Sequence, residues 1–343
     1  MVSGEYLVSK VYKIKSCKVK DKKIEGNKTL NPKPEMAEKV VEKKLRPQRL
    51  NEFIGQEKIK EQLEIFLTAA QSRGEQLDHI LFYGPPGLGK TTLACLMARE
   101  MSCNIKITSG PALTRAGDLA SILTGLKKGD FLFIDEIHRL NKLVEEMLYA
   151  AMEDFALDIV LGKGPAAKTV RLNLQKFTLV GATTRIGLIS GPMRDRFGYV
   201  QQLDFYEDKD LGEIVERTAE VLGVKIEPQA AVSIAKRSRG TPRIANRLLR
   251  RVRDYAEVKN DGLITLREVE EALKMLGVDD SGLSDADRRY LDIVKNQYHG
   301  GPVGVENLAA SLSEDVGTIT EVYEPFLMKK GLIKRTPKGR VSL

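Results

Sequence analysis

The segment from Gly84 to Thr91 has the sequence GPPGLGKT, which matches the pattern G-x-x-x-x-G-K-[ST]. An apolar run, Ile80–Tyr83, precedes it, and a stretch rich in alanine, leucine and methionine follows it. This order predicts a strand, a tight loop and a helix, with backbone N–H groups and the positive end of the helix directed at an anion. We expect Lys90 to contact the β- and γ-phosphates of a nucleotide and Thr91 to bind Mg²⁺. A chance glycine-rich turn would explain the loop but not the strand and helix that flank it.

From Leu45 onwards, short apolar runs alternate with amphipathic stretches, which predicts a parallel sheet with helices on both faces. We expect this α/β domain to occupy residues 45–204. The predicted strands are Ile80–Tyr83, Ile105–Thr108, Phe131–Ile134 and Phe177–Ala182. The predicted helices are Lys58–Ala70, Thr91–Met101, Asp118–Leu126 and Lys142–Phe155.

Beyond Asp204 the sequence predicts two smaller domains. Residues 205–278 contain only helical patterns, which indicates a small all-helical domain. These patterns are Asp210–Leu222, Ala230–Arg237, Ile244–Val258 and Leu266–Leu276. The stretch Asp279–Asp285 is rich in aspartate, serine and glycine and predicts a linker. In the last domain, residues 279–343, three short helices should follow it, and then a Leu332–Val341 segment with a Pro-Lys-Gly turn.

The net charge of +8 is concentrated near the N-terminus. Residues 1–44 hold twelve lysines and six acidic residues, a surplus of six, which leaves only +2 for the other 299 residues. A segment of this composition cannot bury enough apolar surface to fold, so we expect residues 1–44 to lack stable order. A short strand near Val8–Ile14 is the alternative. Because the rest of the chain is nearly balanced, its overall charge is weak support for nucleic-acid binding.

Two further features concern the cellular compartment. No apolar run approaches the roughly 20 residues needed to span a bilayer, and the N-terminus lacks the apolar core of a secretory signal. The three cysteines, Cys17, Cys95 and Cys103, show no paired spacing and no histidine partners. We therefore expect reduced thiols in a cytoplasmic protein without a membrane span.

A second candidate site feature is the buried-strand pattern Phe131–Ile134, which ends in the two acids Asp135 and Glu136. Ligands of open α/β sheets bind at the carboxyl ends of the strands, so both carboxylates should face the phosphates. Asp135 suits the Mg²⁺ shell, and Glu136 is placed to polarise an attacking water. The alternative is a pair of solvated acids at a helix N-terminus. We expect the nearby His138 to be a surface or packing residue.

Further polar residues follow the later elements. Thr183 and Thr184 end a strand, and because side chains alternate along a strand, only one can face the γ-phosphate; we favour Thr184. Arg194 and Arg196 flank an acid and are either a surface ion pair or a finger that completes the site of a neighbouring subunit. Arg243 opens a helix of the second domain and is either a second nucleotide sensor or a solvated residue.

Across residues 45–343 the chain resembles a known family. Residues 45–47 (Leu-Arg-Pro) and 53–56 (Phe-Ile-Gly-Gln) resemble the adenine-side motif of AAA+ ATPases, whose P-loop and Asp-Glu pair the chain shares. A set of more specific segments resembles the RuvB family, the motor subunits of Holliday junction branch migration. These segments are residues 135–139, 152–155, 181–185, 194–198, 239–243 and 336–340. Residues 300–340 are similar to the C-terminal winged helix of that family. The resemblance does not extend to residues 1–44, a lysine-rich arm that is longer than expected because family members usually begin shortly before the Leu-Arg-Pro segment.

The resemblance assigns roles to individual residues. It implies Glu136, Lys90 and Thr184 as catalytic residues, with Arg196, and Arg194 as second choice, acting in the site of the next subunit. Thr91 and Asp135 would bind Mg²⁺. The implied ATP contacts are Leu45, Arg46, Gly87, Gly89, Lys90, Thr91, Thr92, Glu153, Asp154, Phe155, Arg196, Tyr206 and Arg243. The implied DNA contacts are Arg335, Lys338 and Arg340.

The resemblance also implies a function and partners. It predicts an ATP-driven homo-hexamer that moves Holliday junctions along duplex arms in recombination and repair, with ATP and Mg²⁺ as cofactors. A RuvA-type junction-recognition protein would target the junction, and a RuvC-type resolvase is a further candidate partner. The alternative is a clamp-loader or initiator-like ATP switch that acts on DNA. Clamp loaders end in a helical collar, whereas the winged helix expected here also occurs in initiators.

Two segments outside the ATP site invite specific predictions. The apolar runs around Ile159–Leu161 and Thr169–Leu172 predict a β-hairpin, and the resemblance implies that Ile159 and Leu161 bind the RuvA-type partner. A disordered insertion is the alternative. Near the C-terminus, four basic residues lie within seven positions around a Pro-Lys-Gly turn, which predicts the wing of a winged helix. The alternative there is a solubilising basic tail.

Overall fold

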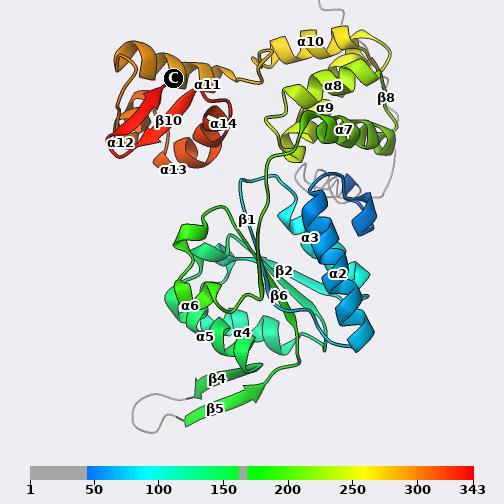
Figure 1. The fold of residues 1–343 in the computed structure, drawn as a ribbon, viewed down its shortest axis with the longest axis vertical. Coiled ribbons are helices and arrows are strands. Elements are labelled where there is room, and N and C mark those ends of the chain that lie inside the picture. Colours follow the sequence, from blue (N-terminus) through cyan, green and yellow to red (C-terminus); the bar gives the residue numbers. More distant parts are fainter. Residues whose placement is uncertain (1–44, 162–167) are drawn as a thin grey trace, which may run out of the picture. The chain divides into compact units, whose positions relative to one another are not determined.

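The computed structural model describes residues 45–161 and 168–343 (Figure 1). The expectations for residues 1–44, including the strand near Val8–Ile14 and the thiol of Cys17, therefore lie outside the described residues. Cys95 and Cys103 are free thiols. In the described ranges, the helices include none that is long and apolar enough to cross a membrane.

A five-stranded parallel sheet forms the centre of the first domain, in the order β2-β3-β6-β1-β7. Its strands are β1 (Ile80–Tyr83), β2 (Ile105–Ser109), β3 (Phe131–Asp135), β6 (Thr178–Thr183) and β7 (Tyr199–Gln202). The four strands expected from apolar runs are confirmed. The fifth, β7, was missed because its sequence, Tyr-Val-Gln-Gln, is half polar, as suits a half-buried edge strand that pairs only with β1.

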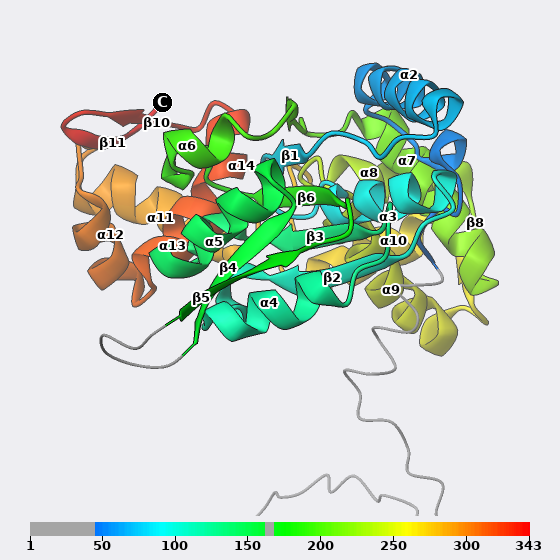
Figure 2. The same ribbon diagram turned by 90° about the horizontal axis from the view of Figure 1, so that it is seen from below.

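Alternating side chains of the sheet bury two separate cores. Residues such as Phe82 and Phe133 pack with α2 (Glu57–Arg73) and α3 (Lys90–Glu100) on one face. Their neighbours Leu81 and Leu132 pack on the other face with helices α4 (Ala116–Thr124) and α5 (Lys142–Glu153). Figure 2 shows these helices on both sides of the strands. The period-2 alternation of a strand thus explains how short apolar runs are covered on both faces.

Short elements and one hairpin complete this domain. Single turns of 3₁₀ helix occur at Leu50–Glu52, Gly110–Ala112, Ile137–Arg139 and Ile186–Leu188, and α6 is the short helix Gly191–Arg194. The predicted β-hairpin is confirmed as an antiparallel pair, β4 (Ala156–Leu161) and β5 (Lys168–Asn173). In both ribbon views it projects from the domain (Figure 1, Figure 2). Its tip, residues 162–167, lies outside the described residues.

The second domain contains the four expected helices. They are α7 (Asp208–Leu222), α8 (Pro228–Lys236), α9 (Pro242–Lys259) and α10 (Leu266–Met275). The expectation of helices alone was incomplete, because the two-residue strands β8 (Lys225–Ile226) and β9 (Leu263–Ile264) pair in parallel between them. Two residues are too short to produce a strand pattern in the sequence. Helix α9 begins with a proline at its first turn, a position where the missing N–H has no helical partner.

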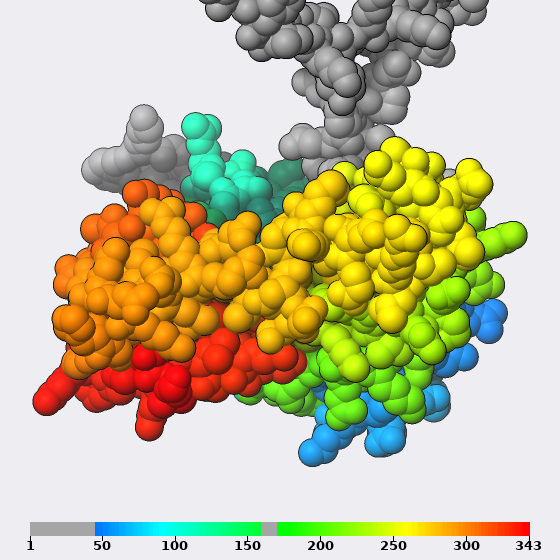
Figure 3. Space-filling model, turned by 90° about the horizontal axis from the view of Figure 1, so that it is seen from above, coloured from blue at the N-terminus to red at the C-terminus, as the bar shows by residue number. Residues whose placement is uncertain are grey.

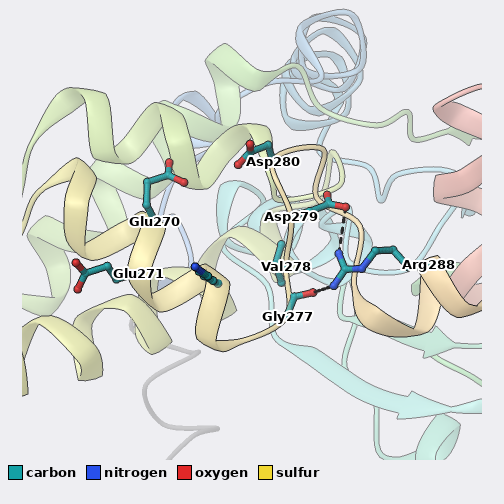
Figure 4. Close-up of a pocket in the computed structure, with 8 residues that line it drawn as sticks. Glu270, Glu271, Gly277, Val278, Asp279, Asp280 and Arg288 are labelled. Carbon is teal, nitrogen blue, oxygen red and sulfur yellow. Dashed lines mark hydrogen bonds and ion pairs between the residues drawn. The ribbon is translucent and has the colours of Figure 1, made fainter.

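The predicted linker Asp279–Asp285 is an ordered turn. The Asp279 carboxylate accepts the backbone N–H groups of Ser281 and Leu283, both at 2.9 Å. Arg288 donates to that carboxylate at 3.1 Å and to the Gly277 carbonyl at 2.8 Å, as the dashed lines in Figure 4 show. The pocket drawn there is lined by carboxylates, among them Glu270 and Asp280, and by the paired Asp279 and Arg288, and it contains none of the residues expected to bind nucleotide.

The third domain has the predicted three helical segments followed by a β-hairpin. The first is α11 (Asp285–Asp292) with a π-helical turn, Ile293–Gln297; the second is α12 (Val305–Leu312); the third joins α13 (Val316–Thr318), a π-helical turn (Ile319–Tyr323) and α14 (Glu324–Lys329). Strands β10 (Ile333–Thr336) and β11 (Gly339–Ser342) pair antiparallel, with Arg335 opposite Arg340. This confirms the wing, which is drawn red at the surface in Figure 3.

Candidate active site

The loop between β1 and α3 has a backbone that only glycine accommodates at three positions. Gly84, Gly87 and Gly89 have φ angles of 137°, 85° and 99°. A Cβ atom at Gly84 would lie 2.5 Å from the Leu203 carbonyl oxygen, and one at Gly89 would lie 3.0 Å from the ring of Phe53. These glycines let the chain turn tightly enough to direct its N–H groups inward. Phe53 belongs to the adenine-side motif at residues 53–56, but it was not among the residues expected to contact ATP.

Lys90 is the first residue of α3, and its side chain is turned into the loop. Its ammonium donates to the carbonyl oxygens of Gly84 at 2.8 Å and Pro85 at 2.9 Å. Burial lowers the pKa of Lys90 to about 8, although the nearby carboxylates of Asp135 and Glu136 oppose this shift. Thr91 and Thr92 follow in the first turn of α3 and are half-buried. A cation in this position is suited to phosphate oxygens that approach the same loop.

Strand β3 brings its two terminal carboxylates to the same region. The Asp135 carboxylate accepts the backbone N–H of Glu136 at 3.0 Å. Glu136 has a left-handed backbone, with φ of 49°, which ends the strand and turns the chain into the 3₁₀ turn Ile137–Arg139. Strand β3 is separated from β1 only by β6, whose end accepts the Gly84 N–H at 3.2 Å, so β3 ends near the loop. The structure therefore gathers Lys90, Asp135 and Glu136 as the sequence predicted.

The two threonines at the end of β6 have different surroundings. Thr184 is half-buried, and its hydroxyl donates to Oε2 of Glu136 at 3.4 Å. Thr183 is fully buried, and its hydroxyl oxygen lies 2.8 Å from Nδ1 of His138 and accepts the Arg185 N–H at 2.9 Å. Thr184 is therefore the threonine that contacts Glu136, and its role as the sensor stays a prediction. His138, which we expected to be a surface or packing residue, is buried, and it also lies beside Glu136, 3.4 Å from its Oε2 atom.

Residues of the second domain and of the entry segment border the loop. The Tyr206 hydroxyl donates to the Leu88 carbonyl at 3.2 Å, and the Arg243 N–H donates to the Gly87 carbonyl at 3.4 Å. Arg46 reaches the sulfur of Cys95 on α3 at 3.9 Å, and Leu45 beside it is half-buried. These four predicted nucleotide contacts therefore lie around the P-loop or its helix.

The remaining predicted ATP contacts form a separate cluster at the end of α5. Arg196 donates to Glu153 at 2.8 Å and to the Pro192 carbonyl at 2.7 Å, and its guanidinium lies 4.8 Å from the centre of the Tyr149 ring. Arg194 is exposed.

The other two members of this group also have partners outside the P-loop. Asp154 pairs with Arg171 of the hairpin at 2.7 Å, and Phe155 packs edge-on against Phe177. The contacts found for Glu153, Asp154 and Phe155 in the described part of the chain do not include the P-loop. A role for these residues at ATP would therefore require the nucleotide of another subunit.

The partner-binding prediction falls on the hairpin. Ile159 is paired with Val170 and Leu161 with Lys168 in the antiparallel register. Leu157, further down β4, is fully buried, whereas Val170 is exposed. Directly opposite residues of an antiparallel pair share a face, so the exposed apolar Val170 lies on the same face as position 159.

The predicted DNA contacts on the wing divide into two kinds. Lys338 is exposed in the turn. Arg335 and Arg340, which we expected to bind phosphates, both pair with the carboxylate of Glu324, at 2.5 and 2.9 Å. Glu324 is fully buried, so these two arginines neutralise an interior charge as well as facing the surface. No local pattern indicates this pairing, because Glu324 looks like an ordinary helix-start residue in the sequence.

Comparison with known proteins covers the same three domains. Residues 45–203 match the Holliday junction DNA helicase RuvB P-loop domain, residues 206–279 the RuvB AAA lid domain, and residues 280–342 the RuvB C-terminal winged helix domain. The chain is 59% identical over 298 residues to the Holliday junction branch migration complex subunit RuvB of Clostridium kluyveri, covering 87% of this chain and 85% of that protein. With the same subunit of Chloroflexus aurantiacus it shares 58% identity over 313 residues, covering 91% and 89%.

Solved structures give the same result. The structure of the Holliday junction branch migration motor RuvB of Thermotoga maritima has a TM-score of 0.80 and 52% identity, covering 88% of this chain and 96% of that one. A mutant of the same protein has a TM-score of 0.81 and 53% identity, covering 87% and 95%. The parallel-sheet domain, the helical lid and the winged helix are thus those of one family. The chain belongs to the RuvB family of AAA+ ATPases.

Proposed function

We propose that this chain is the subunit of an ATP-driven ring that moves Holliday junctions along DNA by branch migration. The observation that carries the proposal is the match of all three domains to a single family whose named members are branch migration subunits. A clamp-loader or initiator-like switch would share the P-loop and the paired acids. The RuvB-type lid and winged helix favour the motor.

In this proposal, ATP hydrolysis uses residues around the P-loop. Lys90 binds the β- and γ-phosphates, and Glu136 orients the water that attacks the γ-phosphorus. Thr184 contacts the γ-phosphate from beside Glu136. Tyr206 and Arg243, from the lid, contact the nucleotide from the side of Leu88 and Gly87, the residues whose carbonyls they already bind.

A magnesium ion fits the donors that the chain offers. The Thr91 hydroxyl and the Asp135 carboxylate would hold it, and both are oxygen ligands of the kind that Mg²⁺ prefers. Asp135 remains suited to this role because, among the described residues, hydrogen bonds use only its Oδ1 atom, which accepts the Glu136 N–H. The bound ion supplies positive charge next to the β- and γ-phosphates.

The cluster at the end of α5 is proposed to act between subunits of a homo-hexamer. Arg196, held by Glu153 and stacked on Tyr149, would be the finger that stabilises the transition state at the nucleotide of the next subunit, with Arg194 as the second choice. Glu153, Asp154 and Phe155 would face that same nucleotide. This placement explains why they lie apart from the P-loop of their own chain.

Two exposed hairpins are proposed to contact the other partners. The β4–β5 hairpin, with Ile159 and Leu161, would bind a RuvA-type junction-recognition protein, and a RuvC-type resolvase is a further candidate partner. The wing, with Arg335, Lys338 and Arg340, would contact phosphates of duplex DNA. Such contacts position a protein on DNA without reading its sequence.

The deciding experiment is ATP-driven dissociation of a synthetic four-way junction, with and without a RuvA-type protein. We expect the wild-type chain to separate the junction when the partner is present. A Glu136→Gln variant should bind ATP and DNA normally, because Lys90 and Thr91 still hold the phosphates, but its hydrolysis of ATP should nearly stop and the junction should not move. DNA-stimulated hydrolysis by the wild type without any junction movement in the presence of the partner would favour the switch instead.

A further inference from the structure

His138 is a buried histidine that contacts the proposed catalytic glutamate. It lies in the 3₁₀ turn directly after β3, and its side chain is 6% exposed. One ring nitrogen, Nδ1, is 2.8 Å from the hydroxyl oxygen of Thr183. The other, Nε2, is 3.4 Å from Oε2 of Glu136. The imidazole therefore bridges the end of β6 and the carboxylate at the end of β3.

The surrounding hydrogen bonds decide which nitrogen carries the proton. The Thr183 hydroxyl oxygen already accepts the backbone N–H of Arg185 at 2.9 Å. Its own proton finds no acceptor other than His138 Nδ1 among the hydrogen bonds of the described residues. With Nδ1 accepting, a neutral imidazole carries its proton on Nε2, the atom that faces Glu136.

The neutral ring is the form that its surroundings favour at neutral pH. Burial lowers the pKa of His138, and this effect outweighs the opposing influence of the Glu136 carboxylate; Arg185 lowers the pKa further. A neutral ring with a fixed tautomer can donate to a carboxylate without neutralising its charge. This property suits a residue that orients a catalytic base.

We propose that His138 is a positioning residue for ATP hydrolysis, fixed by Thr183 with its Nε2 facing Oε2 of Glu136. Thr184 donates to the same oxygen, at 3.4 Å. With Thr184 donating to Oε2 and His138 facing the same oxygen, Oε1 is left as the acceptor that orients the attacking water. The arrangement follows the general logic in which a catalytic base is itself oriented by a third group. The inference rests on the proposed role of Glu136.

The test compares three substitutions that keep different parts of the imidazole. His138→Gln retains an N–H near the position of Nε2, His138→Asn retains only a group near Nδ1, and His138→Ala retains neither. We expect His138→Ala and His138→Asn to lower kcat by about 10–100-fold, because misplacing a reacting group costs up to roughly 10² in rate. The affinity for ADP should stay within about twofold, since His138 does not contact the P-loop in the described structure, and His138→Gln should recover most of kcat.

His79 provides a matched control within the same domain. It is also a buried histidine, 8% exposed, but its ring contacts the Met152 carbonyl and the Leu179 N–H, which are structural groups. His79→Asn should lower the melting temperature and leave kcat of the folded protein near the wild-type value. If His138→Ala only lowers the melting temperature in the same way, or if His138→Gln is as slow as His138→Ala, the positioning role is wrong.

A double variant separates this inference from the role of Glu136. If His138 acts through Glu136, then adding His138→Ala to Glu136→Gln should slow single-turnover hydrolysis no further, because the group it positions is already gone. A further tenfold decrease in the double variant would show that His138 acts on something else. Wild-type turnover in Glu136→Gln alone would instead overturn the assignment of Glu136. If Glu136→Gln hydrolyses ATP slowly but His138→Ala hydrolyses it at the wild-type rate, only the present inference about His138 is overturned.

Discussion

The fully buried carboxylate of Glu324 predicts that the wing arginines stabilise the winged helix, whatever they do on DNA. Arg340 donates to Oε1 of Glu324 at 2.9 Å, and its side chain is 17% exposed. Arg335 donates to Oε2 of Glu324 at 2.5 Å, and its side chain is 42% exposed. The Tyr290 hydroxyl is a third donor, at 3.3 Å. Removing one arginine therefore leaves the buried Glu324 carboxylate with one cationic donor fewer. Removing both leaves the Tyr290 hydroxyl as its remaining side-chain donor among the described residues.

The expected magnitudes follow from these hydrogen bonds. Arg340→Ala should cost about 1.5–3 kcal/mol, the range for hydrogen bonds to charged groups. Arg335→Ala should cost less, because solvent screens the more exposed guanidinium. The double variant should lose roughly 3–5 kcal/mol, the cost of leaving a buried charge unpaired. For a domain of about 60 residues, each kcal/mol corresponds to about 4–8 °C, so Arg340→Ala should melt at least about 6 °C lower.

Calorimetry of the full chain, with hydrogen exchange to assign the transition to residues 284–343, measures this effect. Exchange data are needed because several domains do not unfold as one two-state unit. Adding Glu324→Gln to the double variant should restore part of the stability, since it removes the unpaired charge. If Arg340→Ala melts within about 2 °C of the wild type, or the triple variant is no more stable than the double, the reasoning from Glu324 is refuted.

Two lysines of the same wing provide the control. Lys334 and Lys338 are exposed, and neither pairs with a carboxylate in the described part of the chain. Lys334→Ala/Lys338→Ala should leave the melting temperature unchanged. If the wing holds DNA phosphates, this double variant should still lower the slope of log affinity against log salt by about 0.9 for each phosphate that the wing no longer neutralises. The matching measurement on Arg335→Ala/Arg340→Ala must be made below the melting temperature of that variant.

Three further outcomes are expected. Because burial lowers the pKa of Lys90 to about 8, raising the pH above that value should deprotonate Lys90 in the free protein and weaken ADP binding by up to about tenfold per pH unit. Lys90→Arg, which stays protonated, should bind ADP without this pH dependence. A constant ADP affinity of the wild type from about pH 7 to 9.5 would contradict the prediction. Mixing Arg196→Ala with Lys90→Ala subunits should restore some ATPase activity if Arg196 acts in trans, whereas no recovery in rings shown to be mixed would argue for a role within its own subunit. Replacing Ile159 and Leu161 by aspartate should abolish binding of the RuvA-type partner with basal ATPase unchanged; retained binding would exclude the hairpin as the docking site.

The parts of the fold that the sequence predicted are those set by local patterns. Strands buried on both faces, such as Phe131–Ile134, are continuous apolar runs, and the glycine loop before Lys90 has fixed spacing. The parts that were missed depend on tertiary context. Strand β7 is half polar because it lies at the sheet edge, and β8–β9 is held by only two residues on each side. Neither leaves a periodic signal in its own segment.

The same distinction explains the site. Asp135 and Glu136 were found because they end a buried strand, which is a local feature. His138 acquires its role from Thr183, 45 positions away in the chain, through the parallel pairing of β3 with β6. No spacing rule in the sequence connects the two residues. The sequence showed that His138 follows Glu136 by two residues. It did not show the direction of the 3₁₀ turn that places the His138 ring beside Glu136.

The structure also changes which basic residues of the wing should contribute most to DNA binding. An arginine has five N–H donors, and one buried carboxylate occupies only some of them. Arg335 uses its Nε for Glu324 and its Nη2 for the Thr320 carbonyl, yet it is 42% exposed, so its remaining donors can reach a phosphate. Arg340 is 17% exposed and directs both its Nε and Nη2 at Glu324. The salt dependence of DNA binding should therefore come from Lys334, Lys338 and Arg335 more than from Arg340, because counterions are released by cations that reach phosphates and Arg340 is directed at Glu324.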